Sequence, residues 1–143
     1  MPTDITTATS IEIKAPAARV WEALTTPELI KRWFFGVETE AEWREGGRIV
    51  HRGEFRGRPY EDKGTILRLE PEELFVHTHW SSVSGVPDAP EHYQEVEWSL
   101  AEYDDATTEL VVSETNVPSE DAKAMSEQGW EASLRALKDL LEA

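Results

Sequence analysis

His77 and His79 are separated by one residue, and this spacing could place two imidazoles on one metal ion. Alternate residues of a β-strand share a face, so the pair could bind a metal such as zinc. The other residues of the same stretch are more apolar and are predicted to point into the core: Leu74, Val76, Thr78 and Trp80. We therefore expect His77 and His79 to face solvent, and we expect no metal site.

Two further residues could contact a bound molecule. His51 shares a predicted strand face with Ile49, so it could be a hydrogen-bonded core histidine or could contact a ligand. Glu114 continues the face of Leu110 and Val112 and could place a carboxyl group at the edge of a cavity as a general acid. A paired or solvated glutamate at a strand end is the alternative interpretation.

Other catalytic arrangements are missing from the sequence. There is no cysteine, which excludes disulfides, thiolate zinc sites and a cysteine nucleophile. The serines between positions 81 and 84 lie in a stretch rich in Gly and Pro that predicts a loop. No nucleophile elbow or phosphate-binding glycine loop is present. We therefore assign no catalytic residues and no cofactor, and favour a binding protein over an enzyme.

The six tryptophans are the most unusual feature of the composition. Trp21 is predicted to be core, whereas the other five come from five different elements and are predicted to lie on inner faces. Packing alone could explain each of them, but their convergence favours a pocket lined by aromatic rings. The residues predicted to line it are Trp33, Phe34, Trp43, His51, Tyr60, Trp80, Trp98, Glu114, Met125, Gly129 and Trp130.

The elements that must position these residues follow from the spacing of apolar side chains. Residues 9–14 alternate as a strand, and two short helices follow, the second beginning at Thr26-Pro27 and ending at Gly36. From residue 37 to about residue 115 the apolar pattern has a period of two, interrupted by short turns. This pattern predicts six strands in an antiparallel meander.

The last segment changes to a helical period. Ser119 is a suitable N-cap, and the helix is predicted to run from there to about Leu141. The residues predicted to be buried along it are Met125, Trp130, Leu134, Leu137 and Leu141. Only this helix is long enough to cover the sheet, so we expect a curved antiparallel sheet wrapped around it, with a pocket between them.

The order of these elements, together with several short motifs, resembles a known superfamily. The motifs are Lys31-Arg32-Trp33-Phe34, Gly46-Gly47-Arg48, the segment from Gly64 to Pro71, and Gly129-Trp130 followed by Leu134, Leu137, Lys138 and Leu141. They resemble the START-like superfamily, also called SRPBCC or birch-pollen-allergen-like. Within it the chain is most similar to bacterial homologues of the C-terminal domain of the activator of the heat-shock protein 90 ATPase.

The resemblance implies an α+β helix-grip fold in the order β-α-α-β6-α, and a hydrophobic ligand cavity in a single domain spanning residues 1–143. It does not imply one reaction. The function we expect is binding of a small apolar or aromatic molecule. One alternative is an enzyme like the polyketide cyclases and aromatases of this superfamily. Another is a chaperone-interacting protein, although the eukaryotic activator uses an N-terminal domain for which we expect no room in this chain.

Charge and apolar content restrict the partners further. The chain has 29 Asp and Glu against 14 Lys and Arg, for a net charge of −15. A surface of that sign repels phosphate groups, so we expect neither nucleic acid nor a membrane as a partner. No apolar run is long enough to span a bilayer, and the N-terminus does not resemble a secretory signal. We therefore expect a cytoplasmic location.

Overall fold

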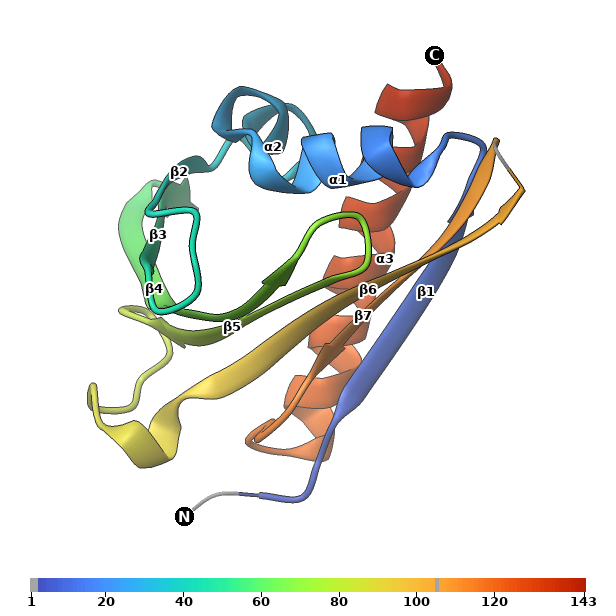
Figure 1. Cartoon of the computed structure of the whole chain (residues 1–143). Coiled ribbons are helices and arrows are strands. Elements are labelled where there is room, and N and C mark those ends of the chain that lie inside the picture. The colour runs from blue at the N-terminus through green and yellow to red at the C-terminus, as the bar shows by residue number, and fades with distance from the viewer. Residues whose placement is uncertain (1–2, 105) are drawn as a thin grey trace.

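The computed structural model describes residues 3–104 and 106–143 of the chain. Within these residues, seven strands and four helical segments follow one another (Figure 1). The strands are β1 (Thr7–Ile13), β2 (Glu38–Ala41), β3 (Arg48–Phe55), β4 (Arg58–Glu70), β5 (Leu74–Ser81), β6 (Gln94–Asp104) and β7 (Thr107–Glu114). The helices are α1 (Ala17–Thr25), α2 (Pro27–Trp33), the short 3₁₀ helix η1 (Pro90–His92) and α3 (Glu120–Glu142).

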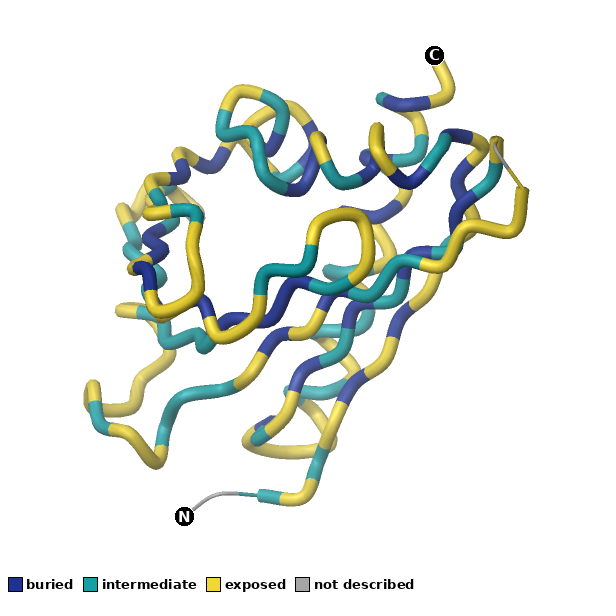
Figure 2. The backbone as a smooth tube through the Cα atoms, in the orientation of Figure 1, coloured by how far each residue is buried: buried dark blue, intermediate teal, exposed yellow. Residues whose placement is uncertain are grey.

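All seven strands form one antiparallel sheet in the order β1-β7-β6-β5-β4-β3-β2. Helix α3 runs along one face of the curved sheet, while α1 and α2 cover one end of it (Figure 1). Buried residues alternate with more exposed ones along β7, most of β1 and the first half of β6, as expected for strands with one face in the core (Figure 2). The predicted α+β helix-grip fold and the predicted order of elements are confirmed.

Helix α3 begins as the sequence predicts. The Ser119 hydroxyl oxygen accepts a hydrogen bond from the backbone N–H of Ala122 at 3.1 Å, which satisfies one of the free donors at the helix start. Leu134, Leu137 and Leu141 are buried in the main hydrophobic core. This apolar stripe holds the helix against the sheet.

The prediction that Met125 is buried is wrong, because 74% of its surface is exposed. Helical residues advance by about 100° each, so a position nine residues before Leu134 lies about half a turn from the buried stripe. Met125 therefore faces away from the core, although it is apolar.

This orientation predicts different costs for two substitutions in the same helix. Leu137 is completely buried, so Leu137→Ala should lower the free energy of unfolding by about 2–5 kcal/mol. Met125→Ala removes little buried surface and should change it by less than about 0.5 kcal/mol. Urea denaturation of both variants measures this, and comparable losses would show that α3 packs in another orientation.

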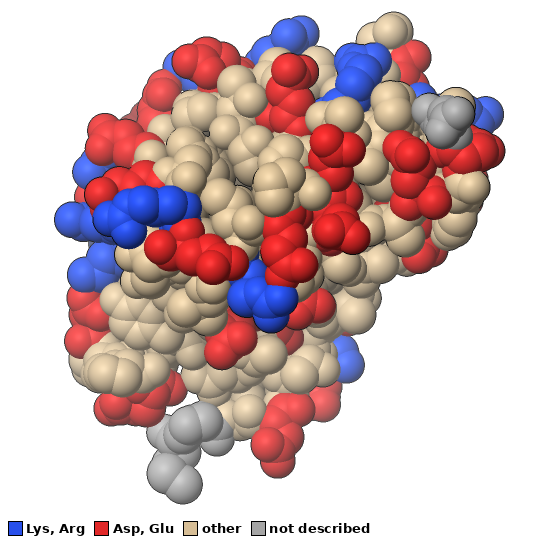
Figure 3. All heavy atoms as spheres, viewed as in Figure 1, with Lys and Arg blue, Asp and Glu red and all other residues tan. Residues whose placement is uncertain are grey.

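In Figure 3 acidic side chains are scattered over the visible face, and Lys and Arg side chains lie mainly along its edges. No helix within residues 3–104 and 106–143 combines the length and apolarity needed to cross a membrane.

Candidate functional site

A cavity of about 260 Å³ lies between the sheet, α2 and α3. The residues that line it are Leu24, Ile30, Trp33, Phe34, Phe35, Trp43, Ile49, His51, Asp62, Phe75, His77, His79, Val96, Trp98, Glu114, Ser126, Gly129, Trp130 and Ser133. Eight predicted site residues are among them: Trp33, Phe34, Trp43, His51, Trp98, Glu114, Gly129 and Trp130. Their position on the wall is what the structure shows, and contact with a ligand remains a prediction.

Four aromatic rings from three elements form a continuous part of the wall. Phe34 and Trp130 are stacked nearly parallel, with ring centroids 5.8 Å apart. Trp98 meets Trp130 edge to face at 5.2 Å and Trp33 edge to face at 5.9 Å. The Trp33 indole N–H donates to the Ala23 carbonyl oxygen at 2.9 Å, which fixes that ring against α1. These contacts are the geometries that aromatic pairs prefer, so the rings on this side of the cavity pack favourably against one another.

The cavity reaches solvent where α2 is followed by β2. Phe35 lines the cavity and is nevertheless 69% exposed. Phe35 and Gly36 both have positive φ angles, 53° and 73°, which turn the chain sharply after α2. Such a conformation is uncommon for a residue with a bulky side chain. The turn leaves Phe35 at the entrance.

Gly129 provides open space on the helical side of the cavity. A Cβ atom added to it would have no atom within 4 Å. The glycine is therefore not needed for a close approach of helix and sheet. The structure instead leaves room beside Trp130.

The prediction that His77 and His79 face solvent is wrong. Both line the cavity, together with Phe75 on the same face of β5, and His77 is buried. Val76 is buried on the opposite face, where it is paired in register with Arg68 and Glu97. The aliphatic parts of such long charged side chains can cover an apolar neighbour. The apolar residues of β5 therefore did not identify its inner face.

Trp80 and Tyr60 do not line the cavity, in contrast to the sequence prediction, and neither does Met125. Trp80 lies on the outer face of β5, where its N–H donates to the Val86 carbonyl and Lys63 lies 5.6 Å from its ring. Tyr60 is on the cavity side of β4, two residues before Asp62, but its ring lies against Gly53 of β3, outside the cavity.

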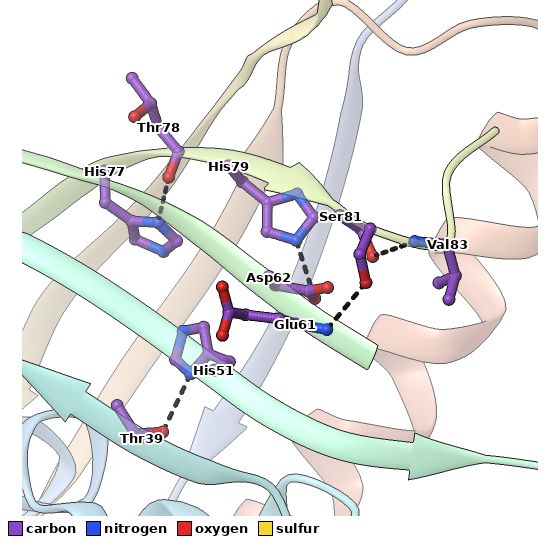
Figure 4. A network of polar contacts seen from close by, with 10 residues as sticks. Thr39, His51, Glu61, Asp62, His77, Thr78, His79, Ser81 and Val83 are labelled. Atoms are coloured by element: carbon purple, nitrogen blue, oxygen red, sulfur yellow. Dashed lines mark hydrogen bonds and ion pairs between the residues drawn. The ribbon is translucent and has the colours of Figure 1, made fainter. Parts of the chain in front are cut away.

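Asp62 and His79 form a hydrogen-bonded pair on the cavity wall that the sequence did not reveal (Figure 4). The His79 Nε2 atom lies 3.0 Å from an Asp62 carboxylate oxygen. Burial opposes both charges, but the hydrogen bond and opposite charges outweigh it. The pKa of His79 therefore lies above its ordinary value, and the pKa of Asp62 lies below its ordinary value. At the cavity wall, His79 can therefore accept a proton when its ring is neutral and donate one when its ring is charged.

His51 and His77 behave differently, because neither has a carboxylate partner in hydrogen-bonding contact. Burial, followed by repulsion from His79, lowers the pKa of His51 to about 4, although Asp62 acts in the opposite direction. Burial, followed by repulsion from His51, lowers the pKa of His77 to about 3, although its hydrogen bond to the backbone of Thr78 acts in the opposite direction. Both rings are therefore neutral at physiological pH.

Glu114 also lines the cavity, but it belongs to β7, which is separated from Asp62 of β4 by the strands β5 and β6. One of its oxygens, Oε1, accepts hydrogen bonds from Thr7 at 3.2 Å, from the Trp130 N–H at 2.9 Å and from the Ser126 hydroxyl. These bonds connect β1, β7 and α3 and hold the Trp130 ring in place. The sequence allowed Glu114 to be either a general acid or a paired or solvated glutamate, and in the structure its carboxylate is paired through hydrogen bonds.

Within the described part of the chain, no three His, Asp or Glu side chains are grouped closely enough to coordinate a metal ion. What the wall offers is hydrogen bonding and proton transfer inside an otherwise aromatic cavity.

Comparisons with known proteins agree with this fold. A sequence profile of the family described as Activator of Hsp90 ATPase homolog 1-like protein matches residues 14–142. The chain belongs to this family. No curated protein sequence gives a significant match.

Solved structures extend the comparison. The solution structure of ChR145 from Cytophaga hutchinsonii is 37% identical and has a TM-score of 0.84, covering 99% of this chain and 97% of that protein. CalU16 from Micromonospora echinospora is 32% identical with a TM-score of 0.68, covering 90% of this chain and 69% of that one. DynU16, a protein in the dynemicin biosynthetic locus, shares the fold at 23% identity and a TM-score of 0.79, over 99% of this chain and 48% of its own.

Proposed function

We propose that the protein binds a small, flat, largely apolar molecule in the cavity between the sheet and α3. The observation that carries the proposal is the cavity itself, about 260 Å³ in volume and lined by the rings of Trp33, Phe34, Trp98 and Trp130. Concave apolar sites with a few polar groups are typical of small-molecule binding. Binding would also bury aromatic surface that otherwise contacts water.

The volume indicates the size of the molecule. An apolar cavity of about 150 Å³ in another protein holds one benzene ring. The cavity described here is larger, at about 260 Å³, which suits roughly two fused rings. Long acyl chains and large multi-ring molecules would require the cavity to expand.

The comparisons support a role with small molecules without identifying one. DynU16 shares the fold and belongs to the dynemicin biosynthetic locus. At 23% identity this likeness is one of fold alone.

One observation favours an enzyme as the second candidate. The Asp62–His79 pair borders the cavity, and such a pair can accept or donate a proton as a general base or acid. An enzyme of the cyclase type would use the aromatic wall to orient its substrate and this pair to move protons. Loss of turnover in His79→Gln, with ligand affinity retained, would support this candidate once a substrate is known.

The binding proposal predicts two signals with a two-ring probe such as naphthalene. Tryptophan fluorescence should change on titration because the indoles lie on the wall. The melting temperature should rise with probe concentration because the probe binds only the folded state.

Gly129→Leu supplies the matched control. The new side chain would extend into open space, so it should fill the cavity while the protein stays folded. Both signals should then be lost. Unchanged binding by Gly129→Leu would place the probe elsewhere, and the absence of both signals in the unmodified protein would contradict the proposal.

A further inference from the structure

The polar part of the cavity wall is assembled from the three neighbouring strands β3, β4 and β5, with Thr39 of β2 beside it. Thr39 of β2 is paired in register with His51 of β3, and His51 with Asp62 of β4. His77 and His79 of β5 extend the same group across the sheet (Figure 4). A ligand that enters between the aromatic rings therefore meets a row of hydrogen-bonding groups on the sheet side.

Two of these imidazoles have one ring nitrogen occupied and the other available. His77 Nδ1 donates to the Thr78 carbonyl oxygen at 2.9 Å, so its Nε2 carries a lone pair and can only accept. His51 Nδ1 lies 2.9 Å from the Thr39 hydroxyl oxygen. When that hydroxyl donates, His51 Nε2 carries a proton and can donate. Among the described residues neither Nε2 atom has a hydrogen-bond partner, and the two ring centroids are 6.2 Å apart.

The charges on the wall disfavour an anion. Asp62 and Glu114 contribute carboxyl groups, and no Lys or Arg of the described chain lines the cavity. Only His79 can bring a positive charge, and its partner Asp62 neutralises it. A carboxylate ligand would lose its hydration without gaining a cation, which is unfavourable in an apolar site.

We propose that the His51–His77 pair recognises a neutral hydroxyl group on a flat aromatic ligand, as in a phenol, and that the cavity rejects the corresponding carboxylate. The hydroxyl donates to His77 Nε2 and accepts from His51 Nε2. A hydroxyl suits this pair because it is both donor and acceptor, whereas a carboxylate can only accept. This inference rests on the proposed function and specifies the chemical class of its ligand.

Three probes of the same ring size test it: naphthalene, 2-naphthol and 2-naphthoate, titrated by calorimetry at neutral pH. One additional hydrogen bond made inside the cavity should strengthen binding by roughly tenfold. We therefore expect 2-naphthol to bind about tenfold more tightly than naphthalene. We expect 2-naphthoate to bind at least about tenfold more weakly than 2-naphthol.

His77→Phe separates the hydrogen bond from the shape of the site. Phenylalanine keeps a flat ring but has no acceptor nitrogen. The preference for 2-naphthol over naphthalene should therefore fall to within about twofold, while naphthalene binding is retained. His51→Phe is the second variant and should reduce the same preference.

The relative affinities of the three probes for the unmodified protein test the inference even if neither variant folds. Equal binding of naphthalene and 2-naphthol would overturn hydroxyl recognition while leaving the binding proposal intact. Tightest binding of 2-naphthoate would overturn the charge argument. If naphthalene and 2-naphthol both fail to bind, the proposed function itself is wrong, and this inference with it.

Discussion

Acidification from about pH 7 to about pH 4.5 is expected to lower the free energy of unfolding by about 3–5 kcal/mol through His51 and His77 alone. Burial, as the main cause, lowers the pKa of His51 to about 4 and that of His77 to about 3. In the unfolded chain both histidines regain an ordinary pKa near 6.5. Between these values the unfolded state binds more protons than the folded state, so stability falls as the pH falls.

The other shifted groups of the cavity do not produce this loss in the same range. The pKa of His79 is raised, so its contribution is fully present below its unfolded pKa and is lost only as the pH rises. The pKa of Asp62 is lowered, so its contribution is lost only below the pH at which unfolded Asp residues titrate. Relief of repulsion in a chain with a net charge of −15 acts in the opposite direction, because acid reduces that charge.

Urea denaturation at several pH values measures the effect. His77→Phe should remove about half of the loss on acidification, because one of the two buried neutral imidazoles is gone. His92→Gln is the matched control, since His92 does not line the cavity. Equal pH dependence in His77→Phe and the unmodified protein would show that His77 is not buried in a neutral form.

Trp98→Ala is expected to lower the free energy of unfolding by about 3–5 kcal/mol. Trp98 is only 5% exposed and lies between Trp33 and Trp130, which it contacts edge to face. Its removal would join a new void to a cavity that already exists, so neighbouring side chains cannot easily fill the space. Both aromatic contacts would be lost as well.

Two matched variants test whether the loss of unfolding free energy comes from the position of Trp98 in the cavity wall rather than from the removal of any tryptophan. Trp80→Ala removes a partly exposed indole on the outer face of β5 and should cost less than half as much. Trp98→Phe keeps an aromatic ring and removes an indole N–H that has no hydrogen-bond partner, so it should cost less than about 1.5 kcal/mol. Similar losses for Trp98→Ala and Trp80→Ala in chemical denaturation would contradict the described packing.

The sequence predicted the aromatic side of the cavity better than its polar side. Trp33, Trp98 and Trp130 were predicted on inner faces, and the structure places all three on the wall. Each belongs to a helix or strand whose apolar pattern is unambiguous. Trp80 was misplaced together with its strand, because β5 carries apolar residues on both faces.

The polar side depends on contacts between strands that the sequence does not reveal. Asp62 and His79 are 17 residues apart, and they meet because β4 and β5 pair in an antiparallel arrangement that places Asp62 opposite Ser81, two residues from His79. When Asp62 is not known to be its partner, burying His79 on an inner face is expected to cost more free energy than exposing it to solvent. The partner that stabilises His79 was therefore needed before its position could be predicted.

The order of strands and helices along the chain, the long C-terminal helix and the family of the chain were all predictable from the sequence. These depend on local spacing, on caps such as Ser119 and on turns, all of which are encoded by neighbouring residues. The face of β5 that lines the cavity, and the volume of about 260 Å³ that remains unfilled, became clear only from the three-dimensional packing. Both outcomes depend on how side chains from distant strands and α3 pack against one another, and a difference of one large side chain can fill or open such a space.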